Sequence, residues 1–201
     1  MAHIDFDLDR FARQARAKAE TLESARQRKM IDVYIEHTTS EIAGELDRVM
    51  ATMVPEPNFH IWLDGRDIGP KGGKAVKAMY KNMFATRSNF MDMDFHRVVI
   101  DDTCFIKEYT QRKIMPGVNF TSGPLGDALR ALGQEPDPSA YYLTKGRAIV
   151  LLPFDDQCRM LGEDAYTAGQ SAIRKLSEDE MPENYQAWLN SAAMQKHLAS
   201  S

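Results

Sequence analysis

Apolar residues recur at helical spacing in the first quarter of the chain. One helical face carries Met30, Val33, Tyr34 and His37, at positions i, i+3, i+4 and i+7. The Thr-Thr-Ser cluster at 38–40 is typical of a helix N-cap, so a second helix is predicted to begin there. Its apolar positions continue to Met53, and the prolines at 55 and 57 end it.

The stretch before this face, residues 7–29, is rich in Ala, Arg and Glu and poor in large apolar residues. High helix propensity without an apolar stripe predicts an exposed helical arm, packed on a neighbouring subunit. We place this N-terminal arm at residues 1–27.

After residue 57 the pattern is that of strands, interrupted by one helix. Strands are predicted at 58–65, 90–100, 104–115, 141–154 and 158–168, and a helix follows the Gly-rich turn at 67–73. The Asp-Asp-Thr link at 101–103 indicates a hairpin. An insertion at 117–139 carries a short helix near Leu125–Leu132, and residues 176–201 form a helical tail. Helices followed by an antiparallel meander are typical of the α+β class.

Composition narrows the class of protein. The 201 residues are 43% apolar and 27% charged, which is ordinary for a globular domain. The formal net charge of -4 excludes a typical nucleic-acid footprint, and no apolar run approaches the length of a membrane span. The charged start lacks the apolar core of a secretory signal, so a cytoplasmic protein is expected. Cys104 and Cys158 are predicted to be reduced, with neither a disulfide nor a zinc site.

Three blocks of sequence resemble the nuclear transport factor 2-like superfamily in its SnoaL-like branch. They are residues 44–62 (GELDRVMATMVPEPNFHIW), residues 72–84 (GGKAVKAMYKNMF), and residues 97–117 (RVVIDDTCFIKEYTQRKIMPG) together with 158–168. The resemblance covers residues 28–175, with the insertion and both terminal extensions outside it. It implies an α+β cone, in which a curved antiparallel sheet wraps around helices, and a homodimer through the outer sheet face and the N-terminal helix.

The function that this resemblance implies is broad, because the fold hosts many activities. Members include ketosteroid isomerase, polyketide cyclases, epoxide hydrolases, dehydratases and non-catalytic binding or dimerisation modules. Their enzymes use acid and base groups that project into the cone, without a metal or organic cofactor. Aligned on the cyclases, this chain has Met115 at the position of a catalytic histidine, and Thr167 or Ala168 near the position of an aspartate. Both departures disfavour aldol cyclase chemistry.

The first candidate group lies on the apolar helical face. Tyr34 and His37 share this face, and Glu41 stands one turn further if the helix continues. His37 would act as a general base, with Glu41 fixing its tautomer and Tyr34 donating to a substrate oxygen. The alternative is a core histidine satisfied by a backbone carbonyl, with Glu41 in solvent. Both interpretations stay open.

Two strands carry the remaining candidates. His60 and Trp62 share one face of the first strand, and if that face is inward, Trp62 could stack on an aromatic ligand. Side chains of residues 104–115 alternate between the two faces of a strand, which gives two possible inward-facing sets. The cyclase alignment favours the set that contains Lys107, Tyr109 and Met115. A buried Lys107 could serve as acid, base or oxyanion clamp, whereas the ordinary fate of a lysine is the outer surface. For Glu163 a structural ion pair is the favoured role.

These observations predict a cofactor-independent lyase or isomerase. Its catalytic groups would be Tyr34, His37, His60, Lys107 and Tyr109, with Trp62, Met115 and Glu41 binding a small apolar, aromatic substrate. No metal is expected, because the histidines lack ligand spacing. The chain also resembles lyases that deformylate lignin-derived diarylpropane diols. A non-catalytic binding or dimerisation module, and a polyketide cyclase or epoxide hydrolase-like enzyme, are the alternatives.

Overall fold

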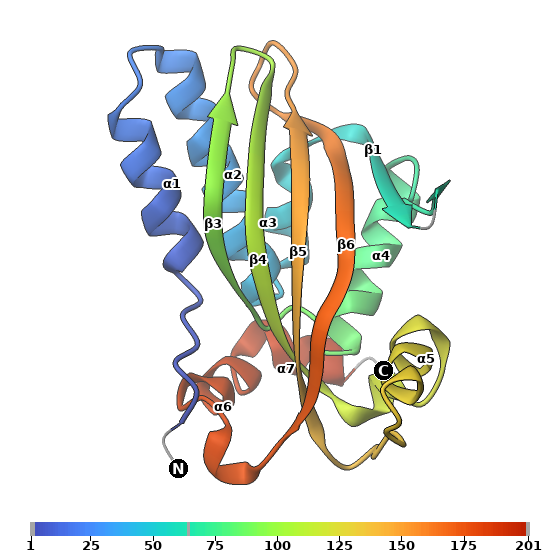
Figure 1. Cartoon of the computed structure of the whole chain (residues 1–201). Coiled ribbons are helices and arrows are strands. Elements are labelled where there is room, and N and C mark those ends of the chain that lie inside the picture. Colours follow the sequence, from blue (N-terminus) through green and yellow to red (C-terminus); the bar gives the residue numbers. More distant parts are fainter. Residues whose placement is uncertain (1–2, 64, 200–201) are drawn as a thin grey trace.

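The fold is built on one six-stranded sheet, shown in Figure 1 in a computed structural model that describes residues 3–63 and 65–199. The strands are β1 (Met53–Leu63), β2 (Arg66–Asp67), β3 (Met91–Ile100), β4 (Cys104–Pro116), β5 (Tyr141–Pro153) and β6 (Met160–Leu176). Their order is β2-β1-β6-β5-β4-β3. Neighbours are antiparallel except β1 and β6, which are parallel.

Helices cover one face of this sheet and close one end of it (Figure 1). The α-helices are α1 (Arg10–Glu20), α2 (Ala25–Ala43), α3 (Leu46–Ala51), α4 (Gly73–Ala85), α5 (Gly123–Ala131), α6 (Asn184–Leu189) and α7 (Ala192–Leu198). Two 3-10 helices are η1 (Gly117–Phe120) and η2 (Glu178–Glu180). The main apolar core lies between α1, α2 and α4 and the inner face of the sheet. The predicted α+β class, a curved sheet around helices, is confirmed.

Helix α2 runs through the position where a second helix was predicted to start. Its N-cap is Ser24, whose side chain accepts from the Gln27 backbone N–H, and it ends at Gly44 in the left-handed region (φ 76°). The expected cap at 38–40 is wrong, because the Ser40 hydroxyl donates back to the Glu36 carbonyl at 2.7 Å inside the helix. The uninterrupted helix keeps His37 and Glu41 one turn apart on one face.

Helix α1 belongs to the core and is not the predicted exposed arm. Phe11, Ala12 and Ala15 are each at most 2% exposed and pack in the main core. Small alanines let the helix approach α2 and β3 closely, and so one large apolar residue, Phe11, is enough to bury this face. The segment ends at Glu20, and α2 begins inside the range assigned to the arm. Residues 1–2 lie outside the described residues.

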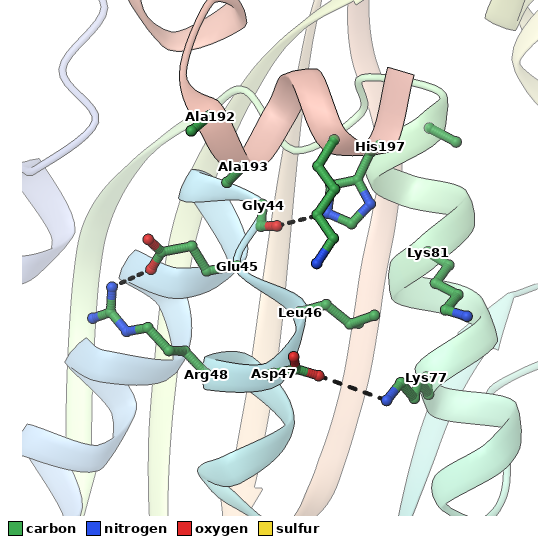
Figure 2. Close-up of a pocket in the computed structure, with 12 residues that line it drawn as sticks. Gly44, Glu45, Leu46, Asp47, Arg48, Lys77, Lys81, Ala192, Ala193 and His197 are labelled. Atoms are coloured by element: carbon green, nitrogen blue, oxygen red, sulfur yellow. Dashed lines mark hydrogen bonds and ion pairs between the residues drawn. The ribbon is translucent and has the colours of Figure 1, made fainter. Parts of the chain in front are cut away.

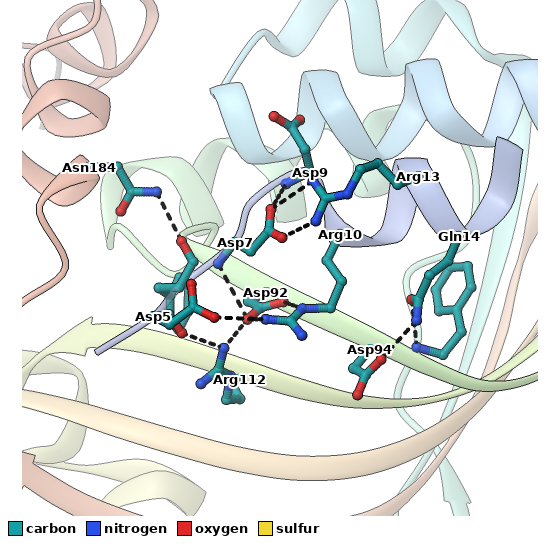
Figure 3. A network of polar contacts seen from close by, with 12 residues as sticks. Asp5, Asp7, Asp9, Arg10, Arg13, Gln14, Asp92, Asp94, Arg112 and Asn184 are labelled. Carbon is teal, nitrogen blue, oxygen red and sulfur yellow. Dashed lines mark hydrogen bonds and ion pairs between the residues drawn. The ribbon is translucent and has the colours of Figure 1, made fainter. Parts of the chain in front are cut away.

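A buried carboxylate joins the N-terminal segment to the sheet (Figure 3). Asp92 on β3 is 2% exposed and accepts from Arg10 Nε at 3.0 Å, from Arg112 on β4, and from the Asp7 backbone N–H at 3.4 Å. One side chain therefore fixes α1, its preceding segment and two strands relative to one another.

The predicted insertion and tail each have their own apolar cluster. The insertion packs through Phe120 and Leu129 against residues of the sheet, Met115, Tyr142 and Ile173. The tail forms η2, α6 and α7 and packs through Tyr185, Trp188 and Met194 against Phe6 and Phe90. Its last residues, 200–201, lie outside the described part of the chain.

The outer face of the sheet exposes several large apolar residues. Trp62, Val99, Ile149 and Tyr166 are 38–51% exposed, and the Trp62 and Tyr166 rings stack with centroids 6.3 Å apart. The predicted homodimer through this face stays a prediction, while α1 already has its apolar face covered by its own chain. Within residues 3–63 and 65–199, no helix has the length and hydropathy to cross a membrane.

Candidate active site

The face of strand β4 that carries Lys107 points toward the core. Phe105, Lys107 and Tyr109 are 0%, 5% and 7% exposed, whereas Ile106 and Glu108 between them are half-buried. The inward set predicted for this strand is thus confirmed over these residues. A lysine in such a position is held by aromatic neighbours that give its alkyl stem an apolar environment.

Tyrosines surround the Lys107 ammonium group. Its Nζ donates to the Tyr34 hydroxyl at 3.3 Å, and lies 4.4 Å and 5.0 Å from the ring centroids of Tyr34 and Tyr109. Burial lowers the pKa of Lys107, and the carboxylates of Glu163 and Glu41 oppose this shift without cancelling it. Burial also raises the pKa of Tyr34 and of Tyr109, so both phenols keep their protons.

His37 on α2 is also buried, with 1% exposure. Its Nδ1 is 2.7 Å from Thr52 Oγ1, and its Nε2 is 3.0 Å from the Tyr80 hydroxyl on α4. Burial raises the pKa of Tyr80, which fits a phenol that donates to the ring. The alternative of a histidine satisfied by a backbone carbonyl does not describe this ring, since each ring nitrogen has a side-chain hydroxyl at hydrogen-bond distance.

Two carboxylates face the same ring nitrogen. Glu163 Oε1 on β6 and Glu41 Oε2 on α2 lie 3.4 Å and 3.9 Å from His37 Nε2, and their side chains are 21% and 15% exposed. Burial, reinforced by the charge of Glu163, raises the pKa of Glu41. Burial opposes ionisation of Glu163 too, but the contact with the His37 ring and nearby positive charges outweigh it and lower its pKa. The two carboxyl groups therefore differ in acidity, and Glu41 is the one that holds a proton more readily.

Replacing Glu41 by glutamine is expected to change how stability depends on pH. Glu41 holds its proton more tightly in the folded chain than in the unfolded one, so its stabilising contribution is complete below about pH 4.5 and is lost as pH rises through the folded pKa. The E41Q variant should therefore gain stability relative to wild type as pH rises from 4.5 toward 7. Urea unfolding at several pH values measures this difference, and a difference that is constant with pH contradicts it.

His37, Glu41 and Glu163 also form the one group in the described part of the chain whose ligand atoms lie close enough to hold a metal ion, within 4.8 Å of one another. Sequence spacing alone did not reveal this convergence, because the third side chain comes from a distant strand. Lys107 and Lys113 lie near enough to both carboxylates to shift their pKa values, and positive charges there oppose a cation. The expectation of no metal stays a prediction.

Two predicted site residues lie outside the core. His60 pairs with Asp67 at 2.7 Å with a side chain that is 40% exposed, and Trp62 is on the outer sheet face with it. The prediction of His60 and Trp62 as cavity residues is wrong. The reason is that Phe59, 2% exposed, occupies the inner face of β1 and packs edge-on against Tyr80. Period-two alternation then sends His60 and Trp62, one and three positions after Phe59, to the outer face.

Met115 points inward but away from the His37 group. It is 3% exposed and packs with Phe120 and Tyr142 in the cluster under the insertion. Its role as a substrate wall is therefore not supported by its surroundings. Of the eight predicted residues, Tyr34, His37, Glu41, Lys107 and Tyr109 are the ones that share the main core region.

Sequence reasoning missed three contributors to this group. Tyr80 lies on the helix predicted after the Gly-rich turn, but its contact with His37 was not foreseen, and Thr52 and Lys113 were not singled out. Glu163 had been assigned an ion pair, and its partner proves to be His37. The available signal was an acidic side chain on the last predicted strand, residues 158–168.

A separate surface groove lies between α3, α4 and α7 (Figure 2). It has a volume of about 810 Å³, and its walls include Asp47 and Lys77, whose charged atoms are 3.7 Å apart. None of the buried acid and base groups lines it, so its size does not make it the site of their chemistry.

Solved structures share this architecture at low sequence identity. A protein from Shewanella putrefaciens named as a SnoaL-like polyketide cyclase matches with a TM-score of 0.55, 9% identity, and coverage of 79% of this chain and 87% of its own. A nuclear transport factor 2-like protein from Anabaena variabilis has a TM-score of 0.52, 12% identity, and coverage of 74% and 94%. A protein from Jannaschia, also named as a SnoaL-like polyketide cyclase, has a TM-score of 0.52, 12% identity, and coverage of 74% and 91%.

The chain therefore has the nuclear transport factor 2-like fold that the sequence resemblance implied. No protein-family model matches the sequence, and no curated protein is detectably similar to it.

Proposed function

We propose that the chain is a cofactor-independent lyase or isomerase that acts on a small aromatic molecule inside the cone. The observation that carries this proposal is the convergence of a buried lysine and a buried histidine–carboxylate group on one core region. Lys107 and His37 come from β4 and α2, and Glu163 completes the group from β6. A core needs none of these groups for packing, and each has a cost of burial that an acid–base function would justify.

Lys107 is the group that handles charge on the aromatic substrate. Because burial lowers its pKa, Lys107 loses its proton more readily than an exposed lysine does; the neutral amine can accept a proton from a phenol and then hold the phenolate oxygen as an ammonium ion. Tyr34, whose raised pKa keeps it protonated, orients that nitrogen through its hydroxyl. The rings of Tyr34 and Tyr109 supply flat apolar walls.

Glu41 and His37 are the groups that move the other protons. A protonated Glu41 can donate to a leaving hydroxyl, because its pKa is raised. His37, held against Glu163, can take a proton from a second hydroxyl. His37 Nε2 and Glu41 Oε2 are 3.9 Å apart, so small movements allow the proton taken by His37 to pass to Glu41. This transfer restores the starting protonation state of both groups.

Within this class we propose a lignin-derived diarylpropane diol as substrate, on the basis of the overall sequence resemblance. Lys107 takes the proton of a para-hydroxyaryl ring while Glu41 protonates the benzylic hydroxyl, and water leaves to give a quinone methide. His37 then takes the proton of the primary hydroxyl, and the adjacent carbon–carbon bond breaks to release formaldehyde. The electrons return to the ring oxygen, which recovers its proton from Lys107. The diol thereby becomes a stilbene, water and formaldehyde, with no net oxidation.

The test measures binding and turnover together. Wild type and the H37A variant are incubated with diarylpropane diols, with steroids and with polyketide-like ketones, and the thermal shift, stilbene absorbance and formaldehyde are recorded. We expect one aromatic class to stabilise both proteins, with turnover falling about 100-fold in H37A because a general base is lost. Prior dialysis of wild type against EDTA is expected to leave turnover unchanged.

Each other outcome has a definite meaning. Equal thermal stabilisation of both proteins without any product would show that the chain is a ligand-binding module and not an enzyme. Turnover that is lost in EDTA and restored by a divalent cation would replace acid–base chemistry with metal chemistry at His37, Glu41 and Glu163. Turnover of a polyketide-like ketone alone would remove the lyase assignment.

A further inference from the structure

The hydroxyl of Thr52 has a fixed donor direction. Thr52 is the C-cap of α3 and is 8% exposed, and its Oγ1 donates to the Val49 carbonyl at 2.7 Å. A hydroxyl has one proton to give and lone pairs that accept. Once that proton points to Val49, Oγ1 can only accept from its other neighbour.

That other neighbour is the His37 ring. Oγ1 lies 2.7 Å from His37 Nδ1, so the short contact requires a proton on Nδ1. In the neutral ring Nε2 is then bare, which matches the Tyr80 hydroxyl that donates to it at 3.0 Å. The hydrogen bond at Nδ1 therefore determines that Nε2, on the other side of the ring, carries no proton.

From this geometry we infer that Thr52 is a positioning residue that holds His37 as the Nδ1–H tautomer, so that Nε2 is the atom that exchanges protons with Glu41, Glu163 and the substrate. Thr52 does not touch the reacting atoms. It sets which nitrogen faces them. The inference deepens the proposed function and rests on it for its catalytic meaning, while the tautomer itself can be measured without any substrate.

Removal of the Thr52 hydroxyl is expected to change which nitrogen of the His37 ring carries the proton. In T52V the buried Nδ1–H has no acceptor, whereas Glu163 Oε1 remains 3.4 Å from Nε2. The neutral ring should then move its proton to Nε2 and donate to Glu163. The α3 terminus keeps the 3.3 Å hydrogen bond from the Thr52 backbone N–H to Val49, and valine fills the volume of threonine.

The experiment is ¹⁵N NMR of the His37 ring in the full chain, recorded at a pH well above the ordinary imidazole range. We expect the protonated-type resonance on Nδ1 in wild type and in T52S, and on Nε2 in T52V. A matched control is T86V, because Thr86 is the C-cap of α4 and its hydroxyl also donates back, to Asn82 at 2.8 Å, without a histidine partner. It should leave both ring resonances unchanged.

Turnover on the substrate class found above is the second readout. T52V is expected to lose about 10- to 100-fold in kcat, the usual effect of removing a group that orients a functional histidine, and T52S to restore it. A wild-type ring protonated at Nε2 alone or at both nitrogens overturns the inference, as does an Nδ1–H tautomer that persists in T52V. If no substrate class turns over, the proposed function fails, and the NMR result still decides the tautomer.

Discussion

Replacing Lys107 by methionine is expected to reduce turnover at least 1,000-fold, of the order found for removal of an acid–base group that also stabilises charge. The same change should raise the free energy of unfolding by about 1 kcal/mol at neutral pH, because an apolar side chain replaces an ammonium group that burial disfavours. The direction of this stability change follows from the lowered pKa of Lys107. The folded chain binds the lysine proton less tightly than the unfolded chain does, so Lys107 reduces the free energy of unfolding at pH values below its ordinary pKa.

Product formation and urea unfolding of the same preparation measure the two effects. The matched control is K145M on β5, where the lysine is exposed, and there both quantities should stay near the wild-type values. A K107M variant that is destabilised and equally active would show that Lys107 has a structural role instead.

Replacing Asp92 by alanine is expected to destabilise the chain by about 3 kcal/mol. The change removes the shared partner of Arg10 and Arg112 and leaves both guanidinium groups without that partner in a partly buried position. The arginine side chains are 28% and 26% exposed, so solvent offsets part of the loss and the effect falls at the lower end of the range for buried pairs. The midpoint of urea unfolding measures it.

The neighbouring D94A variant is the control for this effect. Asp94 lies on the same strand and accepts from the neutral Gln14 side chain at 2.8 Å, so its loss should cost only about 1 kcal/mol. Hydrogen exchange adds a spatial test, since D92A should open α1 before the sheet. Equal destabilisation by the two variants would mean that the arginine pairs contribute nothing specific.

Alternation along β4 made its inner face predictable, with the cyclase resemblance choosing between the two sets. Phe105, Lys107 and Tyr109 share one face of the strand, and the charged Glu108 lies on the other. In the structure the first face is buried, as predicted. The first strand offered no such contrast. Phe59 and Trp62 are both large and aromatic, and so the pattern could not tell which face was covered by α4, and His60 was misplaced with Trp62.

Local propensity was also outweighed by longer-range packing. The Thr-Thr-Ser cluster has the composition of an N-cap, but the buried face of α2 continues past it to Ile42, which is 5% exposed. Hydroxyls that would cap a helix instead bond within it. The contacts of Tyr80 and Thr52 with His37 join residues 43 and 15 positions apart, which no local pattern encodes.

The parallel pairing of β1 with β6 has a consequence for biosynthesis. Met53 leaves the ribosome 107 residues before Met160, its partner in the sheet. At 5–20 residues per second the nascent chain waits about 5–20 s before the pairing can form. During that interval β1 has only the two-residue strand β2 as a sheet partner, and its edge toward β6 is unpaired. We therefore expect the nascent chain to engage a holding chaperone through its first third, and His37 to meet Glu163 only near the end of translation.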